Sequence, residues 1–500
     1  MPKIRIHETD TTGISVPSIP NIVYIPGNAV KAVAPVLYTN ARAFEKAFKE
    51  NNNLIVDDSA NLAHHLLTLG MSVLYEGFAA SESAEGKEVK VTYAMTADGD
   101  ELKFAISGIE YTINAARSEV SYTVESEEEE SGEQTVTAVI SATAGVYGAT
   151  LADSLEVKFD FVDNNVIYTK TYDLSGKPSI DWKKLEDKAI YDVRFLTTGA
   201  FRCPSIDMIK CAAKRVDAVA LIDCGDLEAE SGAVSCREWF DNFLSGIINV
   251  ETGEYNSAIL DEVASSTSDP LAFAAAFAPS WNGTIHGLEG DVVIENIPAS
   301  FGYLIAFARS IQNNPIWYAA AGSFRGLIPE LESVAYEYTT ADIEILQARA
   351  KDVEVALDGE GDNVGYAINP IALVRPFGHI VWGNRTLRFN EEVDEVGVLK
   401  ATSFLNCRVL ATEVAKAIYN AARKYTFEQN SVVLWANFRS EITPLLDRME
   451  SGNGVLGYTL KRVATNKRAR LAAKVTLIPI EGVEDFDVEI EMADNIAVSE

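Results

Sequence analysis

The sequence predicts a multidomain protein of α/β and α+β class, with a mixed-sheet core, an inserted all-β domain and extended terminal arms. Apolar strand-like runs alternate with amphipathic helical stretches in residues 21–80 and 191–370, as in an α/β unit. Residues 81–190 instead show short period-two stretches separated by turn residues, which indicates antiparallel strands. The 500 residues provide enough chain for about two to four domains.

Residues 1–20 contain two prolines and short alternating pieces, so we expect an extended arm. In residues 21–80, Asn40 and Asp57 are expected to cap two helices, with strands before and after them. The strands are expected at residues 21–26, 36–39 and 71–75. This order of strands and helices predicts an α/β unit.

The inserted region, residues 81–190, is strongly acidic. It holds 22 acidic and 10 basic residues, including four consecutive glutamates at 127–130. A solvated hairpin tip explains that run better than a metal site does. We expect an outward-facing β domain.

From residue 191 the α/β pattern returns. Ser205 is expected to cap a helix, and residues 216–222 are an apolar run typical of a buried parallel strand. Further helices are expected at 268–276, from 297, and at 340–349. Asn369-Pro370 predicts a break, because proline disfavours helix at the preceding residue. Residues 365–387 therefore indicate a junction, followed by a C-terminal domain over residues 371–480 and an arm over 481–500.

The C-terminal domain is expected to begin with a helix over residues 409–425. Its apolar residues keep one face at helical spacing. Arg408, Lys416 and Arg423 fall together on the opposite face, at about 100° per residue. A strand at 432–435 and a helix at 440–450 should follow, and then two strands joined by a basic segment.

Acidic and basic residues are unevenly distributed along the chain. The net charge is −31, which argues against a main role in binding nucleic acid or anionic membrane. Residues 370–500 hold 16 Lys+Arg and 17 Asp+Glu, which leaves 26 basic and 56 acidic residues in 1–369. Residues 400–474 hold 13 basic and 5 acidic residues, a net of +8. This basic region is either a solvated face or a partner surface.

Cysteines and the N-terminus indicate a cytoplasmic site of folding. The five cysteines are odd in number and form no C-x-x-C pair, which favours reduced thiols. Cys211 and Cys224 fall in apolar surroundings and are interpreted as core residues. Residues 1–8 lack the apolar core of a signal peptide. No apolar run reaches the roughly 20 residues that span a bilayer.

Catalytic, metal and cofactor motifs are scarce. The sequence has neither a phosphate-binding loop of the G-x-x-x-x-G-K-S/T type nor H-E-x-x-H. Residues 452–457 match G-x-G-x-x-G, but they follow a helix and open a strand, so we interpret them as a turn. His64 and His65 point about 100° apart on a helix and cannot chelate one metal together. His379 lies in a turn, and the acidic loop 358–363 has the wrong spacing for a calcium loop. We expect no enzyme activity, no cofactor and no metal.

Two stretches resemble the contractile tail sheath family of bacteriophages and related injection machines. The first is Asn314-Pro315-Ile316-Trp317-Tyr318-Ala319-Ala320-Ala321-Gly322, followed by Arg325-Gly326-Leu327-Ile328. The second is Asn369-Pro370-Ile371, followed by Gly378-His379-Ile380-Val381-Trp382-Gly383-Asn384-Arg385-Thr386-Leu387. They occur in the family's order and spacing. Gly457-Tyr458 and Thr465-Asn466 extend the resemblance, which covers residues 190–490 well and 15–80 weakly.

The resemblance implies a structural subunit that polymerises as stacked hexameric rings around an inner tube and contracts to drive the tube through a cell envelope. Its partners would be other copies, a tail tube protein, and baseplate and tail terminator proteins, without direct nucleic acid contact or membrane insertion. It would be made in the bacterial host cytoplasm and located in the virion.

The resemblance also implies site residues. Tube contact is expected at Arg408, Lys416 and Arg423 on the inner helix. Strand exchange with neighbouring copies is expected from the arms, at Ile4, Ile6, Val488 and Ile490. The rival interpretation is a non-assembling α/β enzyme or a cell-surface layer protein, although neither a nucleophile with its base nor an export signal was found.

Overall fold

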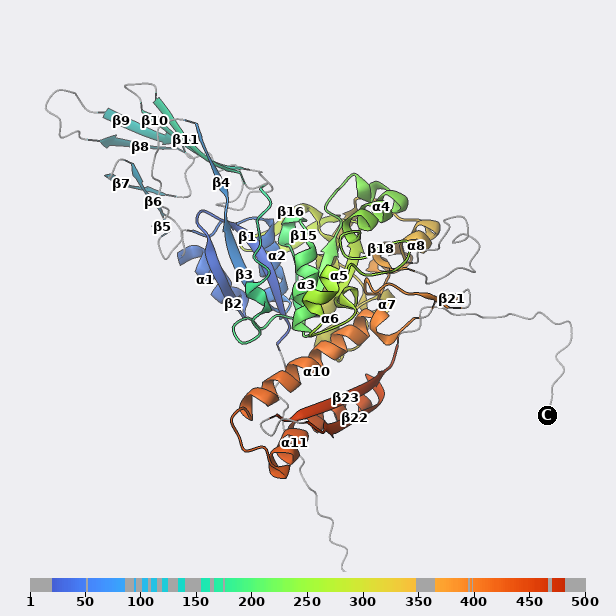
Figure 1. Ribbon diagram of the computed structural model, residues 1–500. Helices are drawn as coiled ribbons and strands as arrows, with labels where there is room; N and C mark the ends of the chain where they lie inside the picture. The colour runs from blue at the N-terminus through green and yellow to red at the C-terminus, as the bar shows by residue number, and fades with distance from the viewer. Residues whose placement is uncertain are drawn as a thin grey trace, which may run out of the picture.

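The computed structural model describes most of the chain, and Figure 1 shows its arrangement. The described residues are 20–50, 53–85, 94–95, 101–106, 109–114, 119–124, 134–139, 154–161, 166–173, 176–347, 365–393, 396–397, 399–465 and 470–481. The expected arms, with Ile4, Ile6, Val488 and Ile490, lie outside these residues, as does the acidic loop 358–363. No helix among the described residues is long and apolar enough to cross a membrane.

An eight-stranded mixed sheet forms the core of what we call the sheet domain. Its strand order is β19-β18-β14-β13-β12-β1-β3-β2. The six inner strands run parallel, and the edge strands β2 and β19 run antiparallel to their neighbours. The strands are β1 Ile22–Ala29, β2 Val33–Tyr38, β3 Ser72–Ala79, β12 Phe195–Leu196, β13 Val219–Asp223, β14 Ala274–Ala278, β18 Ile368–Val374 and β19 Gly378–Val381. The predicted α/β class is confirmed.

Helices cover both faces of this sheet because its strands are apolar on both sides. In β13, Val219 and Leu221 join one apolar cluster, while Ala220 and Ile222 join the other. One face carries α1 Ala41–Glu50, α2 Asp58–Thr68 and α6 Ala299–Asn313. The other carries α3 Ile206–Arg215, α4 Ala233–Leu244, α5 Ser257–Val263 and α8 Thr340–Gln347.

Local signals in the sequence set several helix starts. The side chains of Asn40, Asp57 and Ser205 accept hydrogen bonds from the backbone N–H groups of the following turn, as predicted. The helix expected at 268–276 is wrong: the 3-10 turn η4 Pro270–Phe273 leads directly into β14. The alanines of β14 fit a crowded central strand, because small side chains let helices approach the sheet.

Within residues 81–173, the described segments are all strands, as predicted. A five-stranded antiparallel sheet has the order β4-β11-β10-β9-β8, and β5, β6 and β7 form a separate sheet. These strands lie at one end of the molecule in Figure 1. The insert is shorter than expected, since Trp182 and Leu185 are already buried in the sheet domain. The strands are β4 Ser81–Glu85, β5 Ala94–Met95, β6 Glu101–Ile106, β7 Ile109–Asn114, β8 Glu119–Val124, β9 Gln134–Val139, β10 Ser154–Phe161 and β11 Val166–Asp173.

Smaller elements complete the sheet domain. A three-stranded sheet has the order β16-β15-β17 and lies against α2. The elements are β15 Trp281–Gly287, β16 Gly290–Ile297, β17 Leu331–Val334, the short helix α7 Gly322–Arg325, and the pair β20 Glu392–Val393 and β21 Val396–Gly397.

The remaining elements form the C-terminal module, at the opposite end from the insert (Figure 1). It comprises α10 Leu405–Lys424, α11 Val432–Ser451, β22 Val455–Val463 and β23 Ala472–Pro479. The strand expected at 432–435 is wrong. Ser431 caps α11 by accepting a hydrogen bond from Leu434 N, so this β-branched run opens a helix.

The expected junction at residue 370 is also wrong. Asn369 and Pro370 lie inside β18, which pairs with β14, and β19 closes the same sheet. Pro370 has no N–H to donate to the sheet, but its carbonyl oxygen accepts a hydrogen bond from Trp382 N. The module therefore begins with α10.

Candidate functional site: the junction of the sheet domain and the C-terminal module

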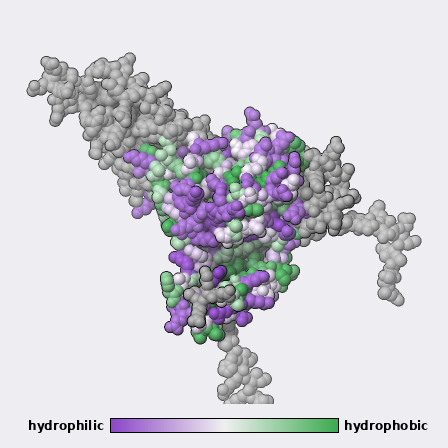
Figure 2. All heavy atoms as spheres, viewed as in Figure 1, coloured by the Kyte–Doolittle hydropathy of each residue, from purple (hydrophilic) through white to green (hydrophobic). Residues whose placement is uncertain are grey.

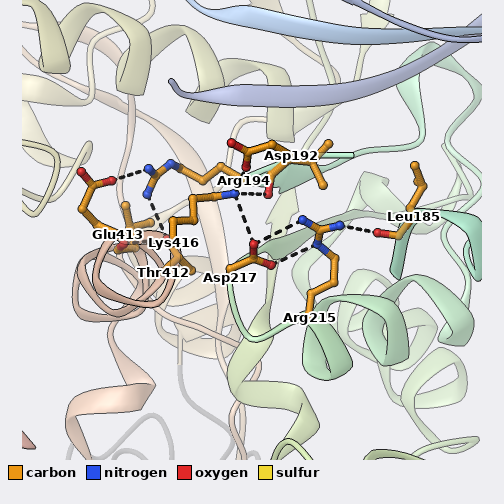
Figure 3. Close-up of polar contacts among 10 residues, drawn as sticks. Leu185, Asp192, Arg194, Arg215, Asp217, Thr412, Glu413 and Lys416 are labelled. Carbon is orange, nitrogen blue, oxygen red and sulfur yellow. Dashed lines mark hydrogen bonds and ion pairs between the residues drawn. The ribbon is translucent and has the colours of Figure 1, made fainter. Parts of the chain in front are cut away.

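A buried ion network joins α10 to the sheet domain (Figure 3). Arg194 immediately precedes β12 and is fully buried. Its guanidinium donates to Thr412 Oγ1 at 3.0 Å and to the Glu413 carboxylate. One strand start in the sheet domain is thereby bound to one turn of α10.

Lys416, one turn further along α10, is 2% exposed. Its ammonium donates to the Asp192 carboxylate, to Val193 O at 2.9 Å and to Asp217 Oδ2 at 3.4 Å. Asp217 also accepts from Arg215 Nε at 3.1 Å. Burial lowers the pKa of Lys416, and the Asp217 and Asp192 carboxylates oppose that shift.

The charges in this network balance. Three cations, Arg194, Arg215 and Lys416, lie among three carboxylates, Asp192, Asp217 and Glu413. Buried charges persist only when they are paired, so loss of one member leaves an uncompensated charge. The network therefore favours one orientation of the C-terminal module on the sheet domain.

Arg408 lies one turn from the start of α10 and is 7% exposed. Its guanidinium stacks over the Phe273 ring, 4.0 Å from the centroid. Burial lowers the pKa of Arg408 to about 10, while Asp269 opposes the shift. This contact anchors a second point on α10 to the sheet domain.

The expected exposed basic face on α10 is thus wrong for Arg408 and Lys416. Helical periodicity places them together, but that side of α10 packs on the sheet domain, while its apolar side packs on α11 and the hairpin. Neither side chain is free to meet another protein. Arg423, near the end of α10, is exposed and lies 5.7 Å from the Tyr419 ring.

A chain of amide hydrogen bonds forms a second connection. Asn384 Nδ2 donates to Asn406 Oδ1 at 2.7 Å, and Asn406 Nδ2 donates to Trp317 O at 3.1 Å. Trp317 Nε1 then donates to Gly452 O at 2.9 Å, at the end of α11. Both motif stretches thus converge on the module. Sequence reasoning gave no role to Asn384 or Asn406. Asn384 lies in the second motif, but Asn406 lies outside both motifs, and no local pattern marks the two as a pair.

Asn369 explains part of the second motif. Its side chain donates to Ala276 O and Arg385 O and accepts from Arg385 N. A Cβ at Gly383 would lie 2.7 to 3.0 Å from Asn369 atoms, so only glycine fits there. The motif residues therefore hold the segment that leads into α10.

The hairpin β22–β23 has two different faces. Leu460 pairs with Val475 and Tyr458 with Leu477, and these four pack against the helices of the module. On the other face Lys461 lies opposite Lys474 and is exposed to solvent with it. Among the described residues, these two strands pair only with each other. Within this described part of the chain, both outer edges of the hairpin are unpaired.

The other singled-out residues have structural partners. His64 bonds to Glu45 at 2.9 Å, whereas His65 bonds to Glu330 at 3.0 Å. His379 bonds to Glu337. Burial raises the pKa of Cys211 to about 12, which fits a core thiol. All five cysteines are free, and no group of three or more metal-ligating side chains occurs within the described ranges.

Comparisons with known proteins give likenesses to solved structures at low sequence identity. No protein-family model matches the sequence. No curated protein matches it either. A chain of the anti-feeding prophage baseplate is similar with a TM-score of 0.39 and 14% identity, over 63% of this chain and 74% of that one. A chain of the contracted sheath complex of the PVC extracellular contractile injection system gives 0.38 and 19%, over 63% and 75%.

Proposed function

We propose that this chain is a structural subunit of a contractile tail sheath, which assembles as stacked hexameric rings around an inner tube. Contraction of the rings would drive the tube through the target envelope. The two sequence motifs support this assignment, and their residues have a structural role. They bind the C-terminal module to the sheet domain through the Asn384–Asn406–Trp317 chain.

The hairpin β22–β23 is the observation that carries the proposal. A two-stranded sheet is marginal alone, and this one is supported on one face by α10 and α11, while its outer edges can still pair with added strands. Its apolar face remains only half-buried under α10 and α11. Residues 3–7 and 486–492 alternate in polarity, as strands that add to such an edge do. Terminal segments of neighbouring copies would complete the sheet and link the copies.

The tube-facing side of the subunit is assigned to exposed parts of the module. Arg423 at the end of α10 and Arg439 on α11 are exposed, as are Val432 and Val433, at 76% and 67%. Figure 2 shows apolar surface beside polar surface on this module. Exposed ion pairs contribute up to about 1 kcal/mol each, which suits a contact that must release on contraction. Baseplate and terminator proteins would cap the polymer in a bacteriophage tail.

Negative-stain electron microscopy of the purified full chain tests the proposal. Rings, tubes or sheaths are expected, and deletion of residues 1–20 should leave monomers or isolated rings. Long sheaths from the deletion variant would rule out the N-terminal link. A monodisperse particle that turns over a substrate would instead support the rival enzyme, and particles bound in a planar lattice would support a surface-layer protein.

A further inference from the structure

Two adjacent histidines of α2 bind the backbone of the same residue in β15. α2 packs against β15, as Figure 1 shows. His64 Nδ1 bonds to His286 O at 3.1 Å, and His65 Nδ1 bonds to His286 N at 3.2 Å. Asn61, one turn earlier on α2, accepts from Leu288 N at 3.1 Å. β17 pairs with β15 only before this point, so side chains of α2 take the place of a neighbouring strand.

The hydrogen-bond partners determine which ring nitrogens carry protons. A carbonyl oxygen only accepts and a backbone N–H only donates. His64 Nδ1 therefore donates to His286 O, whereas His65 Nδ1 is unprotonated and accepts from His286 N. His64 Nε2 lies 2.9 Å from the Glu45 carboxylate. His65 Nε2 lies 3.0 Å from the Glu330 carboxylate. Because a carboxylate only accepts, both Nε2 atoms carry protons, so His64 is charged and His65 is neutral.

The surroundings of the two rings support these different charges. His64 and His65 are 2% and 6% exposed. The Glu45 carboxylate of α1 is available to pair with the His64 cation. Glu330 already pairs with Arg309 of α6, so a proton on His65 would bring a second cation to one carboxylate. Burial opposes the shift, but hydrogen bonds from His65 and Arg309 lower the pKa of Glu330 to about 2, so it stays ionised.

Other titratable groups lie near the two histidines. The His286 ring is exposed and bonds to Asp291 at 3.1 Å. Burial raises the pKa of Glu289 in the turn after β15, and Lys49 of α1 opposes the shift. Burial also raises the pKa of Asp57, the N-cap of α2, to about 6, against hydrogen bonds from two backbone N–H groups. Asp57 therefore titrates in the same range as an exposed histidine, and a test must separate the two.

We propose that His64 and His65 form a pH-sensitive clamp that holds the three-stranded sheet on α2, with His64 charged and His65 neutral when the clamp is closed. Acid adds a proton to His65 Nδ1, toward which the N–H of His286 already points, so this hydrogen bond is lost and β15 separates from α2. Since the proton binds only to the open form, opening becomes more favourable as the pH falls below about 6.5, where an exposed histidine is protonated. Base removes one proton from His64 and costs it the bond to Glu45, while the bond to His286 O can remain. Acid is therefore the stronger trigger.

Amide hydrogen exchange of β15 in the full chain, corrected for the intrinsic effect of pH, measures this opening. The opening equilibrium of the segment with His286 and Leu288 should rise about tenfold between pH 6 and 5, because opening takes up one proton. The variant His65→Asn places an amide oxygen near the position of Nδ1 and cannot be protonated. It should lack this tenfold rise relative to the parent chain. Both chains contain Asp57, so its titration affects them equally.

The matched control is His379→Asn, which removes a histidine that bonds through Nε2 to Glu337 on another part of the sheet domain. It should respond to acid as the parent chain does. An equal response of the parent and His65→Asn would overturn the clamp. Imidazole ¹⁵N NMR of the parent decides independently, even if His65→Asn does not fold. At pH 7, where an exposed histidine is mostly neutral, His64 should carry protons on both ring nitrogens and His65 only on Nε2. A proton on His65 Nδ1 at this pH would also refute the inference.

Discussion

Replacement of Lys416 by methionine should loosen the C-terminal module from the sheet domain. Methionine matches the length of the lysine stem but removes the charge that faces Asp217 and Asp192. Asp217, whose side chain is 4% exposed, would keep only Arg215, whereas Asp192, at 42%, can be hydrated.

The expected cost follows from this geometry. Breaking a buried ion pair by removing one partner costs about 3–5 kcal/mol. Because Asp192 can recover hydration and Asp217 retains Arg215, we expect about 3 kcal/mol, at the lower end of that range. Since about 1.4 kcal/mol is a factor of ten, the opening equilibrium of the module should rise about a hundredfold.

Amide hydrogen exchange of α10 and α11 in the monomer measures this opening directly. It is preferable to one global unfolding midpoint, because a multidomain chain does not unfold in two states. The matched control is Lys424→Met in the same helix, where the lysine is 64% exposed and pairs with Glu441. It should change exchange by less than about fivefold, because exposed pairs contribute little. Equal exchange in the two variants would refute the role assigned to the network.

Three further predictions concern other parts of the molecule. Burial raises the pKa of Asp223 to about 7, although hydrogen bonds from Ser300 oppose the shift. Below the pKa of the unfolded chain the carboxyl is protonated in both states and does not oppose folding. As the pH rises from there to about 7, its ionisation progressively lowers the free energy of unfolding. Asp223→Asn should therefore gain melting temperature relative to the parent between pH 4 and 7, with a constant difference above; a difference independent of pH would contradict this. Arg423→Glu should leave folding intact but weaken assembly on tubes, and tube-bound sheaths at normal yield would refute the contact. Asn406→Ala breaks the bond to Trp317 and should speed exchange at the start of α10 by about tenfold, equivalent to about 1.4 kcal/mol; unchanged exchange would show that the amide chain does not hold the module.

The sequence predicted most of the sheet domain because local signals and tertiary packing agree there. Asn40, Asp57 and Ser205 cap helices where expected, and the apolar run at 216–222 became β13. Prediction failed where a helix cap outweighed the preference of the side chains. Residues 432–435 favour a strand by side-chain type, but Ser431 caps them as the first turn of α11, where Val432 and Val433 stay exposed.

The candidate site was predictable only in part. Helical periodicity correctly grouped Arg408 and Lys416, but periodicity cannot say whether water or another domain covers a face. Arg194 and Asp217 lie about two hundred residues earlier in the chain, at 0% and 3% exposure. Nothing local marks them as partners of α10, so only the fold brings the network together.

The distribution of basic residues now has a physical interpretation. Four of the 13 basic residues in 400–474 have two different kinds of surroundings. Arg408 and Lys416 are satisfied inside the chain, by the Phe273 ring and by carboxylates of the sheet domain. Lys461 and Lys474 remain exposed on the hairpin. A basic helix face is therefore poor evidence for a partner surface when carboxylates of another domain in the same chain can cover it.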